Sequence, residues 1–191
     1  MMYWVADPAF QPVTQVSLNV TLRPQQTRMW CWAASGQMVM EYLGTNVAQC
    51  TQANNRFGRN DCCNIALCPN PVQNHACVTG GWPEFNKYGF QSAHTTNAAL
   101  SWEDLKKEIS DSSNCGRRPF AFTWAWPNGG GHMMVAMGYT TIPLAPMTLK
   151  MVEIFDPWNV CIGDHRFIIY DYYVESPGHH THWDDYYQVR R

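Results

Sequence analysis

Cys31 lies between two tryptophans in the stretch QQTRMWCWAAS, residues 25–35, where a helix signal begins. The thiolate is the nucleophilic form of cysteine, and the unpaired N–H groups and macrodipole at the start of a helix stabilise it. A backbone N–H there, together with a side-chain amide, can also stabilise the oxyanion of a tetrahedral intermediate. Gln25 and Gln26 both offer that amide. The competing interpretation is that Cys31 is a buried structural thiol or half of a disulfide. We reject it only if the chain also offers a histidine that can act as the base.

His132 is the histidine best placed to be that base. It follows three glycines, which let another backbone approach closely, and it opens the apolar strand-like stretch MMVAM. The next strand-like stretch ends at Asp156, and a hairpin folded about Pro143 and Pro146 places that carboxylate opposite His132. A carboxylate there selects the tautomer of the imidazole and favours the imidazolium. Taken alone, Asp156 is also an ordinary turn residue before a proline.

The other six histidines have no evident carboxylate partner set by topology. His75 belongs to a cysteine-rich loop, His94 to a polar linker, and His165 to the start of the last strand-like stretch. The remaining three cluster in GHHTHW, residues 178–183, which could bind a metal. We expect this cluster to be an exposed polar tail instead.

The elements that must position these residues are helical first and strand-like later. We predict a buried helix over residues 31–42, because this stretch lacks proline and a wide polar face and is followed by Gly44 as a C-cap. A second helix is expected after Ser101, an N-cap with Asp104 three residues on. Four strand-like stretches follow, over residues 118–126, 132–140, 148–156 and 166–174. This order predicts an α+β fold with an antiparallel sheet.

The remaining segments are less regular. Residues 1–24 contain three prolines, so we expect extended chain with one edge strand. Residues 45–80 are rich in Asn, Gly, Pro and Cys without periodicity, which predicts a loop region held by cross-links. A turn and a short helix are expected over residues 80–90.

The chain has eight cysteines, a density that favours an oxidising compartment. Cys62 and Cys63 are adjacent, and Cα atoms about 3.8 Å apart are too close for an ordinary disulfide. We therefore expect them to pair with Cys50 and Cys77. If the nucleophile stays free, a third disulfide and one spare thiol come from Cys68, Cys115 and Cys161. A zinc site using His75 is the alternative, although the chain has no two C-x-x-C pairs.

Length and charge narrow the class of protein. The 191 residues suit one domain, with a helical, cysteine-rich half over about 25–118 and a β half over 119–191. Charged residues are 15% of the chain and the net charge is −2, so we expect no nucleic-acid or anionic-membrane partner. No signal peptide is visible and no apolar run is long enough to span a bilayer. We expect a monomer, secreted or periplasmic, and delivery to a host cell stays open.

Three segments together resemble a known family. QQTRMWCWAAS, GGGHMMVAMGY and FDPWN, in the order Cys, His, Asp, resemble papain-like cysteine peptidases, within them the bacterial group of the AvrRpt2 effector protease and C39-like peptidases. The resemblance covers roughly residues 25–174. It implies that Cys31 is the nucleophile, His132 the general base and then acid, and Asp156 the residue that orients the imidazole. The cysteine cluster has no counterpart in papain.

The resemblance also implies which residue stabilises the oxyanion and which fold the chain adopts. The papain-like spacing implies Gln25 as the oxyanion donor, with Gln26 left open, and Asn159 is the fallback for the orienting residue. The implied fold is papain-like. Its helical half starts its central helix at the cysteine, and its antiparallel β half carries His and Asp. A protein or peptide substrate is expected to bind, extended, between the halves, with no cofactor or metal.

Two other classes of function stay open. A transglutaminase or deamidase uses the same Cys-His-Asp order and thioester chemistry on glutamine side chains. A non-catalytic, disulfide-rich binding module with an oxidised Cys31 is the other alternative, since exposed aromatic residues anchor interfaces and the chain has nine tryptophans and nine tyrosines. The residue pattern favours a cysteine endopeptidase.

Overall fold

The computed structural model describes residues 14–111 and 117–191. Four α-helices and one 3₁₀ helix occur in this part of the chain: α1 (Cys31–Tyr42), α2 (Gln49–Phe57), η1 (Phe85–Tyr88), α3 (Trp102–Ser110) and α4 (Tyr170–Val174). The strands are β1 (Gln15–Ser17), β2 (Gln91–His94), β3 (Phe120–Ala125), β4 (Gly131–Leu144), β5 (Met147–Asp156), β6 (Asp164–Ile169), β7 (Glu175–Ser176) and β8 (His180–Arg190). The expected mixed α and β composition is confirmed.

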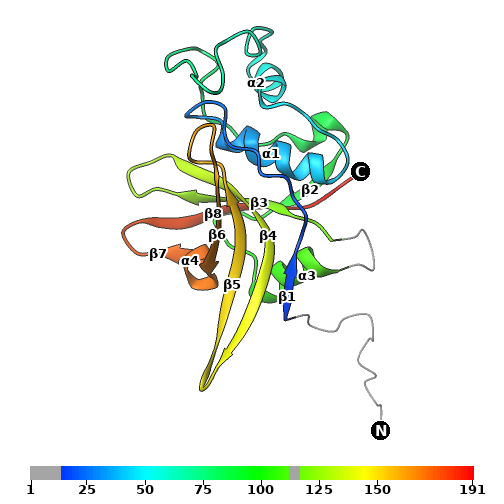
Figure 1. Ribbon diagram of the computed structural model, residues 1–191, viewed down its shortest axis with the longest axis vertical. Helices are drawn as coiled ribbons and strands as arrows, with labels where there is room; N and C mark the ends of the chain where they lie inside the picture. The colour runs from blue at the N-terminus through cyan, green and yellow to red at the C-terminus, as the bar shows by residue number, and fades with distance from the viewer. Residues whose placement is uncertain (1–13, 112–116) are drawn as a thin grey trace.

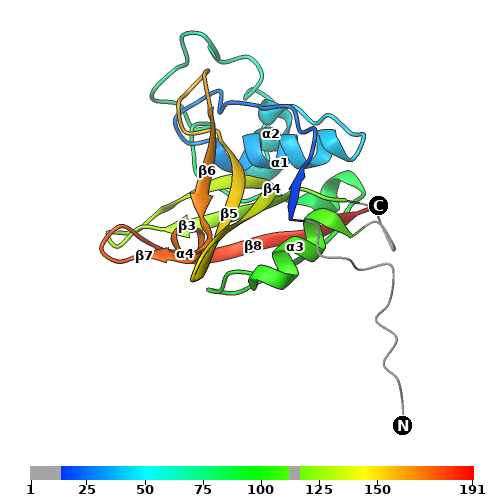
Figure 2. The same ribbon diagram turned by 60° about the horizontal axis from the view of Figure 1, so that its bottom comes forward.

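One antiparallel sheet forms the centre of the molecule. Its strands run in the order β2-β8-β3-β4-β5-β6, while β1 pairs with β4 and β7 pairs with β8. Helices α1 and α2 lie above the sheet and α3 lies below it in Figure 2, and the β4–β5 hairpin extends away from α1 and α2 in Figure 1. The sheet also takes β2 from the half that we expected to be helical, while β1 is the strand expected in residues 1–24. None of the helices in the described ranges is long and apolar enough to cross a membrane.

Helix α1 has the predicted bounds and is almost completely buried, with no polar face. It ends in a Schellman motif: the N–H of Thr45 donates to the carbonyl of Met40, and the N–H of Gly44 donates to Glu41. Gly44 has a φ of +89°, a conformation that glycine adopts without strain. Cys31 is the first residue of this helix.

The second predicted helix is also confirmed. The Ser101 hydroxyl accepts the N–H of Asp104 at 3.1 Å and donates to its carboxylate at 2.6 Å, which caps α3. Leu105 and Ile109, one turn apart, are both fully buried. The short helix expected over residues 80–90 corresponds to η1.

Helix α2 is a correction, because we expected residues 45–80 to be a loop region. The helix buries amides instead of an apolar stripe: Gln52 Nε2 donates to the carbonyls of Ala33 and Val47, and Gln49 Nε2 donates to Pro24. Hydrogen bonds that depend on partners elsewhere in the chain leave no periodic signal in the local sequence. This is why pattern analysis missed the helix.

Two further expectations about the C-terminal part are wrong. The stretch 166–174 is a strand only as far as Ile169, and helix α4 follows. There Tyr173 is buried and its hydroxyl donates to Asp185 at 2.7 Å, so tertiary contacts override the strand propensity of the aromatic run. The GHHTHW segment is not an exposed tail: His180 and His182 are buried in β8, which pairs with β3, and only His179 of the three is exposed.

Three disulfides cross-link the described residues, and Cys62 and Cys63 pair with Cys77 and Cys50, the partners that we expected. Cys50 bonds Cys63, Cys62 bonds Cys77, and Cys68 bonds Cys161. The third bond joins the cysteine-rich loop to the connection between β5 and β6. Cys115, the remaining candidate for the spare thiol, lies outside the described residues, as does the stretch 1–13 of the predicted extended chain.

Candidate active site

The thiol of Cys31 opens into a cavity of about 450 Å³ at the N-terminus of α1. Cys31 is the free cysteine of the described residues. The helix N-cap, Trp30, makes no side-chain capping bond, so the N–H groups of the first turn stay available. The indole N–H of Trp30 instead donates to the carbonyl of Cys77 at 2.7 Å, which anchors this segment on the disulfide-bonded loop.

His132 lies at the start of β4 and forms a buried ion pair with Asp156 at the end of β5. The ring Nε2 and the carboxylate Oδ1 are 2.6 Å apart, and the two residues are 3% and 5% exposed. The predicted juxtaposition of these side chains is therefore present.

The hairpin register that led to this pairing is wrong in detail. Val135, not Met133, lies opposite Phe155, and a bulge shifts the register near Met137. Continuing that register by one residue puts Asp156 opposite Met134. The displacement is by an even number of residues, so Asp156 still projects from the same face as His132. The two side chains meet diagonally rather than directly across the strands.

Asp156 has two further partners, which the sequence reasoning missed. The backbone N–H of Trp158 donates to Oδ1 at 2.9 Å, and the guanidinium of Arg166 on the neighbouring strand β6 bonds Oδ2. Arg166 lies opposite Ile154, two residues from Asp156 on one face. The only sequence signal for this contact is a cation in the strand after the DPWN turn.

The electrostatics of the site favour a thiolate. Burial raises the pKa of the Cys31 thiol, but the interaction with His132 and its charge, together with the backbone N–H groups of Met133 and Trp32, outweigh it. The net result is a thiol pKa below the ordinary value. Because Nε2 of His132 is bound to Asp156, its Nδ1 is the nitrogen left for Cys31, and Nδ1 has no other hydrogen-bond partner.

Two tryptophans enclose the imidazole of His132. The ring of Trp126 is nearly parallel to it at 6.4 Å, and the ring of Trp158 meets it edge-on at 4.8 Å. They leave His132 almost without solvent contact, which strengthens the electrostatic interaction with Asp156.

Of the two candidate amides, Gln25 is the one that bonds the segment after Asp156. Its Nε2 donates to the carbonyl of Trp158 at 2.7 Å, and its backbone N–H donates to Pro157. The backbone N–H of Gln26 donates to the side chain of Gln49 in α2. Asn159, the fallback for Asp156, accepts two backbone N–H groups with its carbonyl in the β5–β6 connection.

Three of the other six histidines have carboxylate partners, contrary to expectation. His165 bonds Glu153 at 2.8 Å, His182 bonds Asp185 at 3.0 Å, and His75 lies 3.9 Å from Asp61. None of these histidines lines the cavity around Cys31.

The zinc alternative rests on one group in the described residues. Possible ligand atoms of Asp61, His75 and Cys77 lie within 4.8 Å of one another. The sulfur of Cys77 is bonded to Cys62, however, so no thiolate is available there while the disulfide is intact.

Hollows flank the cavity on both sides. One of about 870 Å³ shares Trp82, Thr123 and Met133 with it, and one of about 520 Å³ shares Trp126, His132 and Trp158. The three hollows therefore adjoin one another around Cys31 and His132, and we call them together the groove. A groove of this kind suits an extended ligand.

Residues 17–173 match the model of the family described as "Peptidase_C39 like". The match begins in β1 and ends in α4, so it includes Cys31, His132 and Asp156. No curated protein matches the chain.

Proposed function

We propose that this chain, which belongs to the Peptidase_C39-like family, is a papain-like cysteine endopeptidase. Membership in a cysteine peptidase-like family implies a protein or peptide substrate. The observation that carries the finer proposal is the free thiol at the start of α1, beside a buried imidazole whose far nitrogen is held by Asp156. Nucleophile, base and orienting carboxylate thus stand in the order that acyl transfer requires.

The reaction proceeds in two halves. The Cys31 thiolate attacks the carbonyl carbon of the peptide, and the tetrahedral intermediate collapses as His132 gives its proton to the leaving amine. A thioester remains on Cys31. His132 then takes a proton from a water molecule, and the hydroxide attacks the carbonyl carbon of the thioester. The bond to sulfur breaks, the carboxylic acid product leaves, and Cys31 is again a thiolate beside a protonated His132.

The oxyanion is stabilised by the backbone N–H of Cys31 and the side-chain amide of Gln25. Gln25 supports this role because its Nε2 carries two hydrogens and only one contact, to Trp158, is made. A donor aimed at the developing charge contributes to the transition state and not to the ground state.

Asp156 and Arg166 are positioning residues in this mechanism. Asp156 holds His132 with Nε2 protonated, which leaves Nδ1 to exchange the proton with the thiol. Arg166 and the N–H of Trp158 hold the carboxylate in place.

We also propose a secreted or periplasmic location, because three disulfides persist in an oxidising compartment.

The test is cleavage of a denatured protein by the wild type and by Cys31→Ala, with labelling by an epoxide electrophile of the E-64 type. We expect fragments from the wild type, none from Cys31→Ala, and label on Cys31 alone after peptide mapping. Unchanged circular dichroism of the variant controls for the fold. Ammonia release with intact chains would instead assign a transglutaminase or deamidase, and an unreactive Cys31 would assign a binding module.

A further inference from the structure

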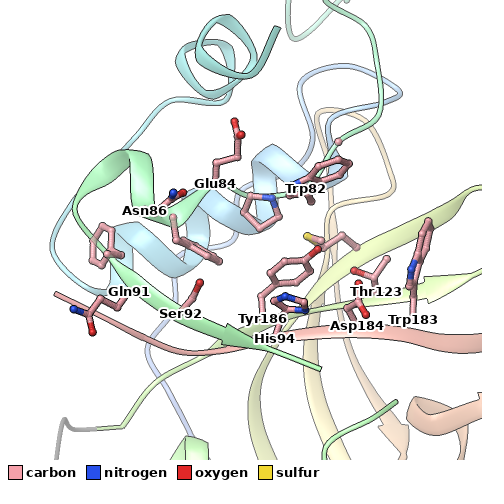
Figure 3. A pocket seen from close by; sticks show the side chains of 15 residues that line it. Trp82, Glu84, Asn86, Gln91, Ser92, His94, Thr123, Trp183, Asp184 and Tyr186 are labelled. Carbon is pink, nitrogen blue, oxygen red and sulfur yellow. The ribbon is translucent and has the colours of Figure 1, made fainter. Parts of the chain in front are cut away.

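The larger of the two hollows that flank the cavity lies beside the proposed nucleophile and has no role in the mechanism. Its volume is about 870 Å³ (Figure 3). Met133, which follows His132 in the chain, lines both this hollow and the cavity around Cys31. A substrate held at the thiol can therefore place a neighbouring side chain in it.

The hollow has aromatic walls. Figure 3 shows Trp82 above it, while Trp183 and Tyr186 of β8 lie below. His94 of β2 stacks on Tyr186 with ring centroids 6.0 Å apart. Aromatic faces bind both apolar groups and cations, so the walls alone do not select the ligand.

The charge in the hollow comes from Asp184. This carboxylate is half-buried between Trp183 and Asp185, and its hydrogen bond is with the backbone N–H of Asn97 at 3.3 Å. Asp184 takes part in no ion pair found among residues 14–111 and 117–191. It is a negative charge without a cation, facing a hollow large enough for a long side chain.

The other carboxylate that lines the hollow differs from Asp184. Glu84 is 2.9 Å from the ammonium of Lys87 and 3.7 Å from the guanidinium of Arg56, so its charge is compensated. Burial and the nearby Asp184 raise the pKa of Tyr186 to about 12, and its hydroxyl stays neutral in the physiological range. Of the two carboxylates that line the hollow, Asp184 is therefore the one without an ion-pair partner among the described residues.

We propose that this hollow binds a lysine or arginine side chain of the peptide substrate, with Asp184 as its ion-pair partner. The inference rests on the proposed function and names its substrate preference. Trp82 already shows that it accepts a cation: the guanidinium of Arg56 lies 3.5 Å from the centre of its ring. The aliphatic stem of the substrate residue packs against the rings of Trp82 and Tyr186 while its charged end reaches Asp184.

The experiment is cleavage-site profiling with a mixed peptide library, comparing the wild type with Asp184→Asn and Asp184→Lys. We expect the wild type to enrich Lys and Arg at one fixed position near the scissile bond. Asp184→Asn is expected to lower kcat/KM for these substrates about tenfold, as loss of a charged hydrogen bond does, and to leave it unchanged where a neutral residue stands there. Asp184→Lys is expected to move the preference to Asp and Glu.

The controls separate specificity from folding. Asparagine in place of Asp184 keeps an acceptor for the N–H of Asn97, and Asp171→Asn removes a similar charge from exposed α4, away from the groove. Asp171→Asn is expected to leave the profile unaltered. Cleavage without basic enrichment, or enrichment that survives in Asp184→Asn, overturns this inference alone. A wild type that cleaves no peptide overturns the proposed function and this inference with it.

Discussion

The part of the chain that the structure describes contains two buried histidine–aspartate pairs, which differ in the surroundings of the second ring nitrogen. In His132–Asp156 the bond is 2.6 Å, and the second ring nitrogen has no protein partner except the thiol of Cys31. In His182–Asp185 the bond is 3.0 Å, and the second ring nitrogen is bonded to the carbonyl of Tyr173. Both pairs are almost fully buried.

Under the proposed function, this difference separates a reactive pair from a structural one. Asp185 also accepts from the hydroxyl of Tyr173 and the N–H of Leu100, so the His182 pair belongs to a closed network in which every partner is a protein group. The His132 pair leaves one nitrogen open. Burial and a carboxylate are common to both pairs, so the buried nitrogen left open beside a thiol is what favours His132 as the proposed base.

The largest effect is expected from removing the reactive imidazole. His132→Ala leaves the thiol without a base, and we expect kcat/KM to fall by on the order of 10⁴-fold or more. The free energy of unfolding, measured in urea, should change far less than the activity. Residual activity near that of the wild type would show that the open nitrogen is not the base.

Alkylation of Cys31 by iodoacetamide provides the matching control. In the wild type the thiol pKa lies below its ordinary value, so the alkylation rate should stay high as the pH falls below 9 and decline only at more acidic pH. In His132→Ala the lowering interaction is gone and burial, which raises the pKa, remains. The rate at neutral pH should therefore be lower in the variant. Identical pH profiles would contradict the Cys31–His132 contact.

Removing His182 from its pair with Asp185 should lower the free energy of unfolding and leave the activity nearly unchanged. His182→Ala breaks a buried, hydrogen-bonded pair, which typically costs about 3 kcal/mol of unfolding free energy. Under conditions where the variant is folded, kcat/KM should stay within a few-fold of the wild type. His179→Ala, in the same segment but exposed, is the matched control and should alter neither quantity. A loss of activity in folded His182→Ala would remove the distinction between the two pairs.

The smallest effect is expected at Arg166, which supports the reactive pair from β6. Its side chain is 41% exposed, so solvent screens part of its interaction with Asp156. We expect kcat to fall about tenfold in Arg166→Gln with KM little changed, and Arg166→Lys to recover most of the loss because it restores the charge. Arg59→Gln, which breaks a surface pair with Asp61, is the control. Equal losses in the Lys and Gln variants would exclude a charge-dependent role.

The sequence predicted the reactive pair better than the closed one, for a physical reason. Cys31 begins a helix whose end is marked in the sequence by Gly44. His132 lies at the start of one strand and Asp156 at the end of the next, and both strands have strong apolar patterns. A strand places its residues on two faces, so an error of two residues in the register did not separate His132 from Asp156.

The features that were missed depend on contacts between distant segments. Helix α2 forms because buried amides of Gln49 and Gln52 meet carbonyls elsewhere in the chain. His180 and His182 look polar in sequence, but stacking on Trp124 and bonding to Asp185 make burial favourable. The sequence around Arg166 indicates its contact with Asp156 only by a cation in the strand after the DPWN turn. Composition and periodicity do not encode such pairings.

The chain order of the site has a consequence for biosynthesis. A ribosome releases Cys31 early, while the base at His132, the carboxylate at Asp156 and the strand that carries Arg166 follow much later. The Cys68–Cys161 bond likewise waits for nearly the whole chain. Under the proposed function, the nascent protein therefore lacks its base and its orienting carboxylate throughout most of its synthesis, and activity is expected only when the last strands have closed the groove.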